Sequence, residues 1–60
     1  MFSYFEMVAL ADLYSKTIGG SWTVDIPGLR SELIHTFGLE DYEAQHVIFQ
    51  MRDRGLIPNG

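Results

Sequence analysis

The sequence predicts a mainly α domain that contains three helices and one short strand after the first helix. Its 60 residues are the length of one small domain. Glycines at Gly19-Gly20 and Gly38 divide it into three segments, and apolar residues recur in each segment at the spacing of a helix. Six residues after Gly20 alternate instead, as in a strand. No repeat or linker is apparent, so we expect residues 1–60 to form a single domain.

The first predicted helix covers residues 2–17, because this stretch lacks glycine and proline and mixes apolar with polar residues. Its apolar residues form two stripes on roughly opposite sides. The first stripe contains Met7, Leu10, Ala11, Tyr14 and Ile18. The second stripe contains Phe2, Phe5, Ala9 and Leu13. A small domain has few helices or strands with which to cover both stripes. We therefore expect the second stripe to be exposed or to form a homodimer face.

A short strand is predicted over residues 22–26, where Trp22, Val24 and Ile26 alternate with polar residues. We expect Trp22 to be a central packing residue of the core, because a large aromatic ring in such a strand usually packs there. A lone strand leaves its backbone N–H and C=O groups unpaired. The strand therefore needs a partner, either a second short strand at the C-terminus around Leu56-Ile57 or another chain.

A second helix is predicted over residues 27–37. Asp25 can cap its first turn, and Pro27 suits the first helical position, where no backbone donor is needed. The stripe expected to face the core is Leu29, Leu33, Ile34 and Phe37.

A third helix is predicted over residues 41–54, after a tight reversal at Gly38, which can adopt a left-handed conformation at little cost. Its core stripe is Ala44, Val47, Ile48 and Met51, at positions i, i+3, i+4 and i+7. Gly55 ends this helix, and Pro58-Asn59-Gly60 is typical of a turn.

The order helix, strand, helix, tight turn, helix resembles the winged helix-turn-helix family over nearly the whole chain. The residues that carry the resemblance are Gly38-Leu39 at the turn, Ala44, Ile48 and Met51 inside the third helix, and Arg52-Asp53-Arg54-Gly55-Leu56-Ile57 leading towards a wing. The resemblance implies a three-helix scaffold whose third helix would face DNA. The family's wing is a hairpin after that helix, whereas this sequence ends at the turn, so we expect the wing to be incomplete.

The charge of the third helix disagrees with DNA binding. The chain has eight acidic and four basic residues, a formal charge of -4. The positions that match the family's DNA-contacting surface include no Lys or Arg: they are Glu40, Asp41, Tyr42, Glu43, Gln45, His46, Phe49 and Gln50. Phosphate neutralisation supplies most non-specific affinity for DNA, so the resemblance implies the fold more directly than the activity.

The leading functional hypothesis is therefore a small non-enzymatic adaptor or inhibitor that binds a protein partner. Tyr42, His46 and Phe49 lie on one face of the third helix, away from its core stripe, and aromatic residues there are typical of protein interfaces. Gln45 lies on the same face. The acids Glu40, Asp41 and Glu43 would set charge complementarity, although carboxylates near a helix N-terminus are also favoured by the helix dipole. The small size suggests a phage or prokaryotic regulator.

Two alternatives belong to other classes. One is a transcriptional regulator that dimerises through the second stripe of the first helix and contacts DNA with Gln45, His46 and Gln50. The other is a structural or assembly subunit for which self-association is the function. Salt-dependent binding to duplex DNA separates the first alternative from the adaptor hypothesis, and oligomeric state tests the second.

No constellation in the sequence predicts catalysis or a cofactor. Glu43 and His46 have the Glu-x-x-His spacing of di-iron bundles, but one copy lacks the further carboxylates that such a site needs. The absence of cysteine excludes thiolate metal sites and fits a reducing cytoplasm. The longest apolar run, Met7 to Ala11, lies between two acids, so we expect neither a signal peptide nor a membrane span.

Overall fold

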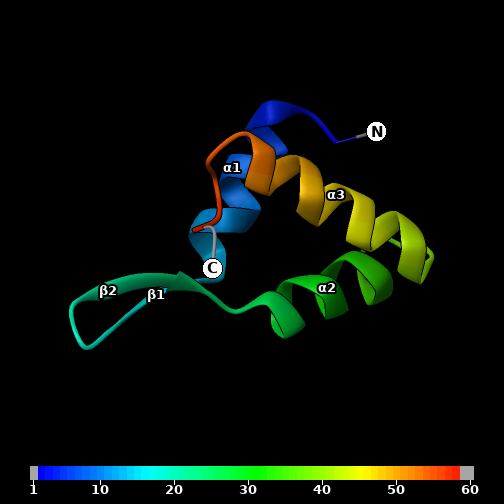
Figure 1. The fold of residues 1–60 in the computed structure, drawn as a ribbon. Helices are drawn as coiled ribbons and strands as arrows, with labels where there is room; N and C mark the ends of the chain where they lie inside the picture. Colours follow the sequence, from blue (N-terminus) through cyan, green and yellow to red (C-terminus); the bar gives the residue numbers. More distant parts are fainter. Residues whose placement is uncertain (1, 59–60) are drawn as a thin grey trace.

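The computed structural model describes residues 2–58, which form three helices and one β-hairpin in the order α1, β1, β2, α2, α3. In Figure 1 the helices gather on one side, and the hairpin extends away from them. The predicted fold class, mainly α with three helices and a strand after the first, is confirmed. The predicted terminal turn includes Asn59 and Gly60, which lie outside the described residues.

Helix α1, Tyr4–Leu13, begins with a reciprocal pair of hydrogen bonds between Ser3 and Glu6. The Glu6 N–H donates to the Ser3 hydroxyl at 3.2 Å, and the Ser3 N–H donates to the Glu6 carboxylate at 2.8 Å. These bonds lower the pKa of Glu6 below its ordinary value, the backbone hydrogen bond from Ser3 being the largest cause. The helix is therefore capped by its own sequence.

The prediction that this helix continues to residue 17 is wrong, because Ser15–Ile18 forms strand β1. Gly19 and Gly20 both have positive φ, 57° and 83°, which is the backbone that joins two strands in the tightest hairpins. Strand β2, Ser21–Val24, pairs antiparallel with β1, so that Ser15 lies opposite Val24 and Ile18 opposite Ser21. The Gly-Gly dipeptide is thus the turn of a hairpin and does not end the helix, which stops at Leu13.

This pairing also corrects the expected partner of the strand. The partner is the preceding segment Ser15–Ile18, and Leu56-Ile57 forms no strand. The predicted strand was placed at residues 22–26, but β2 ends at Val24, and Ile26 opens the next helix. Among residues 2–58 the sheet therefore has two strands and both precede α2.

Helix α2, Ile26–His35, starts at Asp25, whose carboxylate accepts a hydrogen bond from the Gly28 N–H at 3.2 Å. After it, Gly38 has a φ of 71° and reverses the chain, and the Leu39 N–H donates to the Leu33 carbonyl at 3.1 Å. Helix α3, Asp41–Asp53, then packs against α2. The turn predicted at Gly38 is confirmed.

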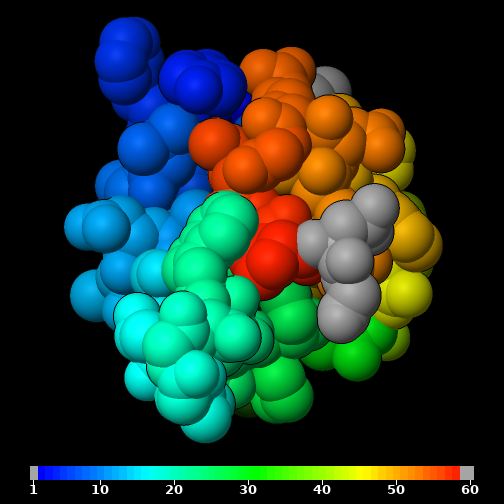
Figure 2. Space-filling view, turned by 60° about the vertical axis from the view of Figure 1, so that its left-hand side comes forward, coloured from blue at the N-terminus to red at the C-terminus, as the bar shows by residue number. Residues whose placement is uncertain are grey.

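The core lies where the three helices meet, and Val24 of the hairpin and Ile57 of the C-terminal segment complete it. All four predicted core residues of α3 are buried, whereas Ile18 and Phe37, which were assigned to core stripes, are exposed. Figure 2 shows the C-terminal segment, in red, between the hairpin and the end of α3. Its Ile57 is buried although it belongs to no strand. The buried core consists of Met7, Leu10, Ala11, Val24, Leu29, Leu33, Ala44, Val47, Ile48, Met51 and Ile57.

One polar contact ties α2 to the end of α1. The Tyr14 hydroxyl donates a hydrogen bond to the Glu32 carboxylate at 3.0 Å, and the Tyr14 carbonyl accepts from the Asp25 N–H at 2.9 Å. Desolvation and then the bond to Glu32 raise the pKa of Tyr14. Tyr14 therefore joins the helix, the hairpin and α2 at one point.

Candidate functional site

The outward face of α3 presents three large side chains to solvent. Tyr42, His46 and Phe49 are all exposed, with 73% of Tyr42 and 53% of Phe49 accessible, while the opposite face supplies the core. This division follows from the 3.6-residue period of the helix, which places positions i, i+4 and i+7 on one side. Phe49 does not pack with Phe2, whose ring instead meets Phe37 with centroids 5.0 Å apart.

The acids at the start of α3 have partners within the molecule. The Glu43 carboxylate accepts a hydrogen bond from the Glu40 N–H at 2.9 Å, which satisfies one of the free donors of the helix terminus. The Asp41 carboxylate forms an ion pair with Nε of Arg30 on α2 at 3.1 Å. Glu43 and Asp41 thus contribute to the start of α3 and to its contact with α2.

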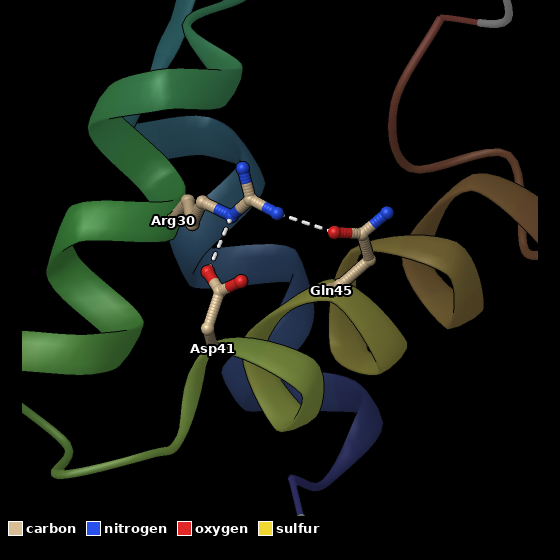
Figure 3. Close-up of polar contacts among 3 residues, drawn as sticks. All are labelled: Arg30, Asp41 and Gln45. Atoms are coloured by element: carbon tan, nitrogen blue, oxygen red, sulfur yellow. Dashed lines mark hydrogen bonds and ion pairs between the residues drawn. The ribbon is translucent and has the colours of Figure 1, made fainter.

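Arg30 brings two of the predicted site residues together (Figure 3). Its side chain extends from α2 across the first turns of α3, where it pairs with Asp41 and donates a hydrogen bond to Oε1 of Gln45. Both members of the ion pair are substantially exposed, so its contribution to stability is small, at most about 1 kcal/mol. Its main effect is to orient Asp41 and Gln45 towards α2.

An open hollow of about 520 Å³ lies between α3 and residues 2–3, the N-terminal arm that precedes α1. Tyr42 and His46 stand on its α3 side, and Phe2 stands on its arm side. Its size falls within the range of binding pockets, and its walls are mostly apolar with a few polar groups. The remaining lining residues are Leu39, Glu43, Val47 and Gln50.

A smaller hollow, of about 120 Å³, lies on the other flank of α3, next to α2. Phe49 and Gln45 border it together with two cations, Arg30 and Arg52. The Arg52 guanidinium carbon is 5.9 Å from the centre of the Phe49 ring, a cation–π arrangement. The sequence prediction assigns neither arginine to the binding face, although it names Arg52 at the end of the third helix. The three-residue spacing of Phe49 and Arg52 could have shown the second, whereas Arg30 is on another helix.

The predicted site residues therefore lie on two flanks of α3, each of which borders a different hollow. Tyr42, His46 and half-buried Glu43 line the hollow beside the N-terminal arm, and Gln45 and Phe49 line the one beside α2. Glu40 and Asp41 are exposed at the start of the helix. A partner that covered the whole face would span both hollows.

A second exposed apolar surface lies on α1. Phe5 is 83% exposed and Leu13 66% exposed, and Ala9 lies between them on the same side of the helix. Phe2, which the sequence placed on this face, is half-buried and packs on Phe37 instead. Tyr4 and Val8 extend the surface along its other flank.

Trp22 is not the core residue that the sequence predicts, since half of its surface is exposed. Its indole N–H donates a hydrogen bond to the Ser15 hydroxyl on the paired strand at 2.8 Å. It shares a shallow depression with Val8 of α1 and Leu56. The hairpin projects beyond the helices, so only Val24, at its base, reaches the core.

Residues 2–58 contain neither a metal-ligand cluster nor a membrane-spanning helix. No group of three or more His, Cys, Asp or Glu side chains in this part of the chain is placed to hold a metal ion. No helix within the same residues is long and apolar enough to cross a bilayer.

Comparison with protein-family models, curated proteins and solved structures found no match to this chain. The likeness to winged helix-turn-helix domains thus stays a prediction from the sequence.

Proposed function

We propose that this chain is a small non-enzymatic interaction module that binds another protein through the outward face of α3. The observation that carries the proposal is the apolar hollow flanked by exposed Tyr42 and His46. Interface hot spots are enriched in aromatic residues beside pockets from which water is excluded on binding. An absence of cysteine favours a cytoplasmic location for this activity.

A protruding apolar side chain of the partner would enter the hollow between the N-terminal arm and α3. Phe2 and Leu39 would contact it from one side and Tyr42 from the other. His46 and Gln50 lie at the same hollow and offer hydrogen-bonding groups at its polar edge. The partner would thus gain apolar burial at the centre and polar contacts around it.

The acidic residues at the start of α3 would mainly change the rate at which the partner associates. Glu40 and Asp41 are exposed, and Asp41 already has a counter-ion in Arg30. Exposed charges change the rate of encounter and selectivity more than they change affinity. We therefore expect a partner with a basic rim around an apolar anchor, whose association slows as salt rises.

The test is affinity capture from the source lysate with three baits, read by quantitative mass spectrometry. The baits are the natural chain, Tyr42→Arg in the hollow, and Thr17→Arg as a control with the same added charge on the exposed hairpin. We expect a partner that is retained by the natural chain and the control and lost with Tyr42→Arg. The nuclear magnetic resonance footprint of that partner should lie on α3, and a footprint confined to other elements contradicts the proposal.

One observation favours the DNA-binding regulator as a second candidate. Arg30 and Arg52 flank Gln45 in the smaller hollow and add cations beside the face that the family resemblance assigns to DNA. An anisotropy titration with random duplex at low and moderate salt separates the two functions. Tight and strongly salt-dependent binding supports the regulator, and no binding at low salt removes it.

A further inference from the structure

The outer surface of α1 consists of apolar residues at regular spacing. Phe5, Ala9 and Leu13 follow one another at four-residue steps and are all exposed, and we call these three residues the outer strip of α1. The other side of the same helix supplies Met7, Leu10 and Ala11 to the core. A helix that is apolar all round normally has neighbours on both sides, and α1 has them on one.

The outer strip has the arrangement that a two-fold pairing needs. Ala9 is near the middle of Tyr4–Leu13, and the larger Phe5 and Leu13 lie one turn to either side. If a second α1 runs antiparallel with Ala9 against Ala9, each Phe5 meets the Leu13 of the other copy. The small residue at the crossing allows the helices to approach closely, and one surface serves both copies, as an isologous interface requires.

The exposed area is sufficient for a stable pair. With Tyr4 and Val8 on one flank and Trp22 beside Val8, the surface offers roughly 600 Å² per copy, or about 1,200 Å² in a dimer, the lower end of specific interfaces. Residues of the hairpin and α1 adjoin through the depression that Val8 and Trp22 share. Interfaces at this lower end are typical of weak, transient association, so we expect dimerisation at micromolar concentrations or above.

The charges near the outer strip permit this pairing. Asp12 is exposed on α1 and stands towards the Val8 flank of the outer strip. In an antiparallel pair centred on Ala9, the two Asp12 residues are offset by about 9 Å along the helix, close to the screening length at physiological salt. Glu6 lies on the opposite flank and caps its own helix. No two like charges need to face each other across the seam.

We propose that the outer strip of α1 binds a second copy of this chain in an antiparallel, two-fold α1 pair centred on Ala9. The pairing uses no residue of the proposed α3 binding face. The dimer therefore presents two α3 faces, and a partner with two sites would bind it with added avidity. Because the surfaces are separate, loss of dimerisation and loss of partner binding are distinguishable.

The first test is the molar mass of the natural chain by light scattering after size exclusion, over loading concentrations from about 5 μM to 1 mM. We expect the mass to rise from one chain to two chains across this range. Ala9→Glu places two carboxylates at the two-fold axis and should raise the dissociation constant by about 100-fold or more. Ile18→Glu, an equal change on the exposed hairpin, should not alter it. Circular dichroism should show the same helical content in all three proteins.

The second test locates the seam with single cysteines, which are the only thiols because the natural chain has none. Under mild oxidation Ala9→Cys should form a covalent dimer about tenfold faster than Ile18→Cys, since sulfurs at the axis can meet the geometry of a disulfide. Leu13→Cys should not, because its two copies lie about 12 Å apart along antiparallel helices. A monomer at all concentrations, a dimer unaffected by Ala9→Glu, or fast cross-linking of Leu13→Cys would overturn the proposal.

Discussion

On α3, Phe49 belongs to the surface and its neighbour Ile48 to the core, and truncating each side chain to alanine tests this assignment directly. The two residues are adjacent on one helix. Replacing either of them with alanine therefore changes the helix propensity by nearly the same amount. Phe49 is 53% exposed and Ile48 is 6% exposed. The stability lost should follow this difference in burial and not the size of the side chain.

The expected magnitudes come from that burial. Complete burial of a Phe side chain is worth roughly 3 kcal/mol, so a half-exposed ring contributes about 1 kcal/mol. The cation–π contact with Arg52 adds about 0.5 kcal/mol at an exposed site. Ile48→Ala removes buried methyl groups and leaves a cavity, which costs about 3 kcal/mol. A domain of this length has a total stability of only about 3 to 9 kcal/mol, so the second variant should be close to unfolding.

Thermal and urea unfolding followed by circular dichroism measure both effects. Phe49→Ala should lower Tm by about 5 to 10 °C, and Ile48→Ala should lower it by at least twice as much. Partner binding should respond in the opposite order when both proteins are compared below their transitions. If Phe49→Ala is as destabilising as Ile48→Ala, then Phe49 is a core residue and the outward face of α3 is wrongly assigned.

Three further outcomes follow from the caps and turns. Gly38→Ala should lower the free energy of unfolding in urea by about 1 kcal/mol. A Cβ at this position would meet no atom, so the cost comes only from the positive φ, which alanine disfavours. An unchanged urea midpoint would show that the turn relaxes. Glu43→Ala should lower the free energy of unfolding by about 0.5 to 1 kcal/mol. It removes the acceptor of the Glu40 N–H, whose hydrogen exchange should become faster. The lowered pKa of Glu6 stabilises the fold above about pH 4.5, and this stabilisation is lost as pH falls through the folded-state value. Glu6→Gln should therefore flatten the acid side of the stability profile, and an unaltered profile would exclude this origin.

The features that the sequence predicts well are those encoded by neighbouring residues. The core stripe of α3 depends only on helical spacing, and all of Ala44, Val47, Ile48 and Met51 are buried. Gly38 has the positive φ that its position after a helix indicates. The capping role of Asp25 is likewise local, and its carboxylate accepts the Gly28 N–H as expected.

The hairpin could not be obtained from helical spacing, because its first strand continues the apolar period of α1. In the sequence Ile18 falls on the apolar stripe of the first helix. The two glycines that follow it have positive φ and reverse the chain, so that the next residues pair with Ser15–Ile18. Pairing with Ser21–Val24 gives the backbone groups on one edge of each segment a partner. A Gly-Gly dipeptide between two short segments that each contain β-branched residues, Thr17-Ile18 before it and Thr23-Val24 after it, is the signal that would have shown the hairpin.

Trp22 and Arg30 show a second limit of sequence reasoning. Alternation places Trp22 and Val24 on one side of a strand, but it does not tell how far the neighbouring elements extend over that side. Val24 is buried and Trp22 is half exposed because they lie at different distances from the helices. Arg30 and Asp41 are brought together by the packing of α2 on α3, which no local pattern contains.

The two exposed surfaces of the molecule differ in the kind of contact they can make. The outer strip of α1 is a convex row of side chains with a small residue at its centre, and a second identical row can match it in a closed pair. The hollow beside the N-terminal arm is concave and needs a protruding side chain. If Phe5 of one copy filled the hollow of another, the pair would still have one free strip and one free hollow, and the contact would propagate into an open assembly. When the outer strips of two copies pair with each other, Phe5 is buried in the pair and cannot enter the hollow of another copy. The hollow beside α3 then stays free for a different protein.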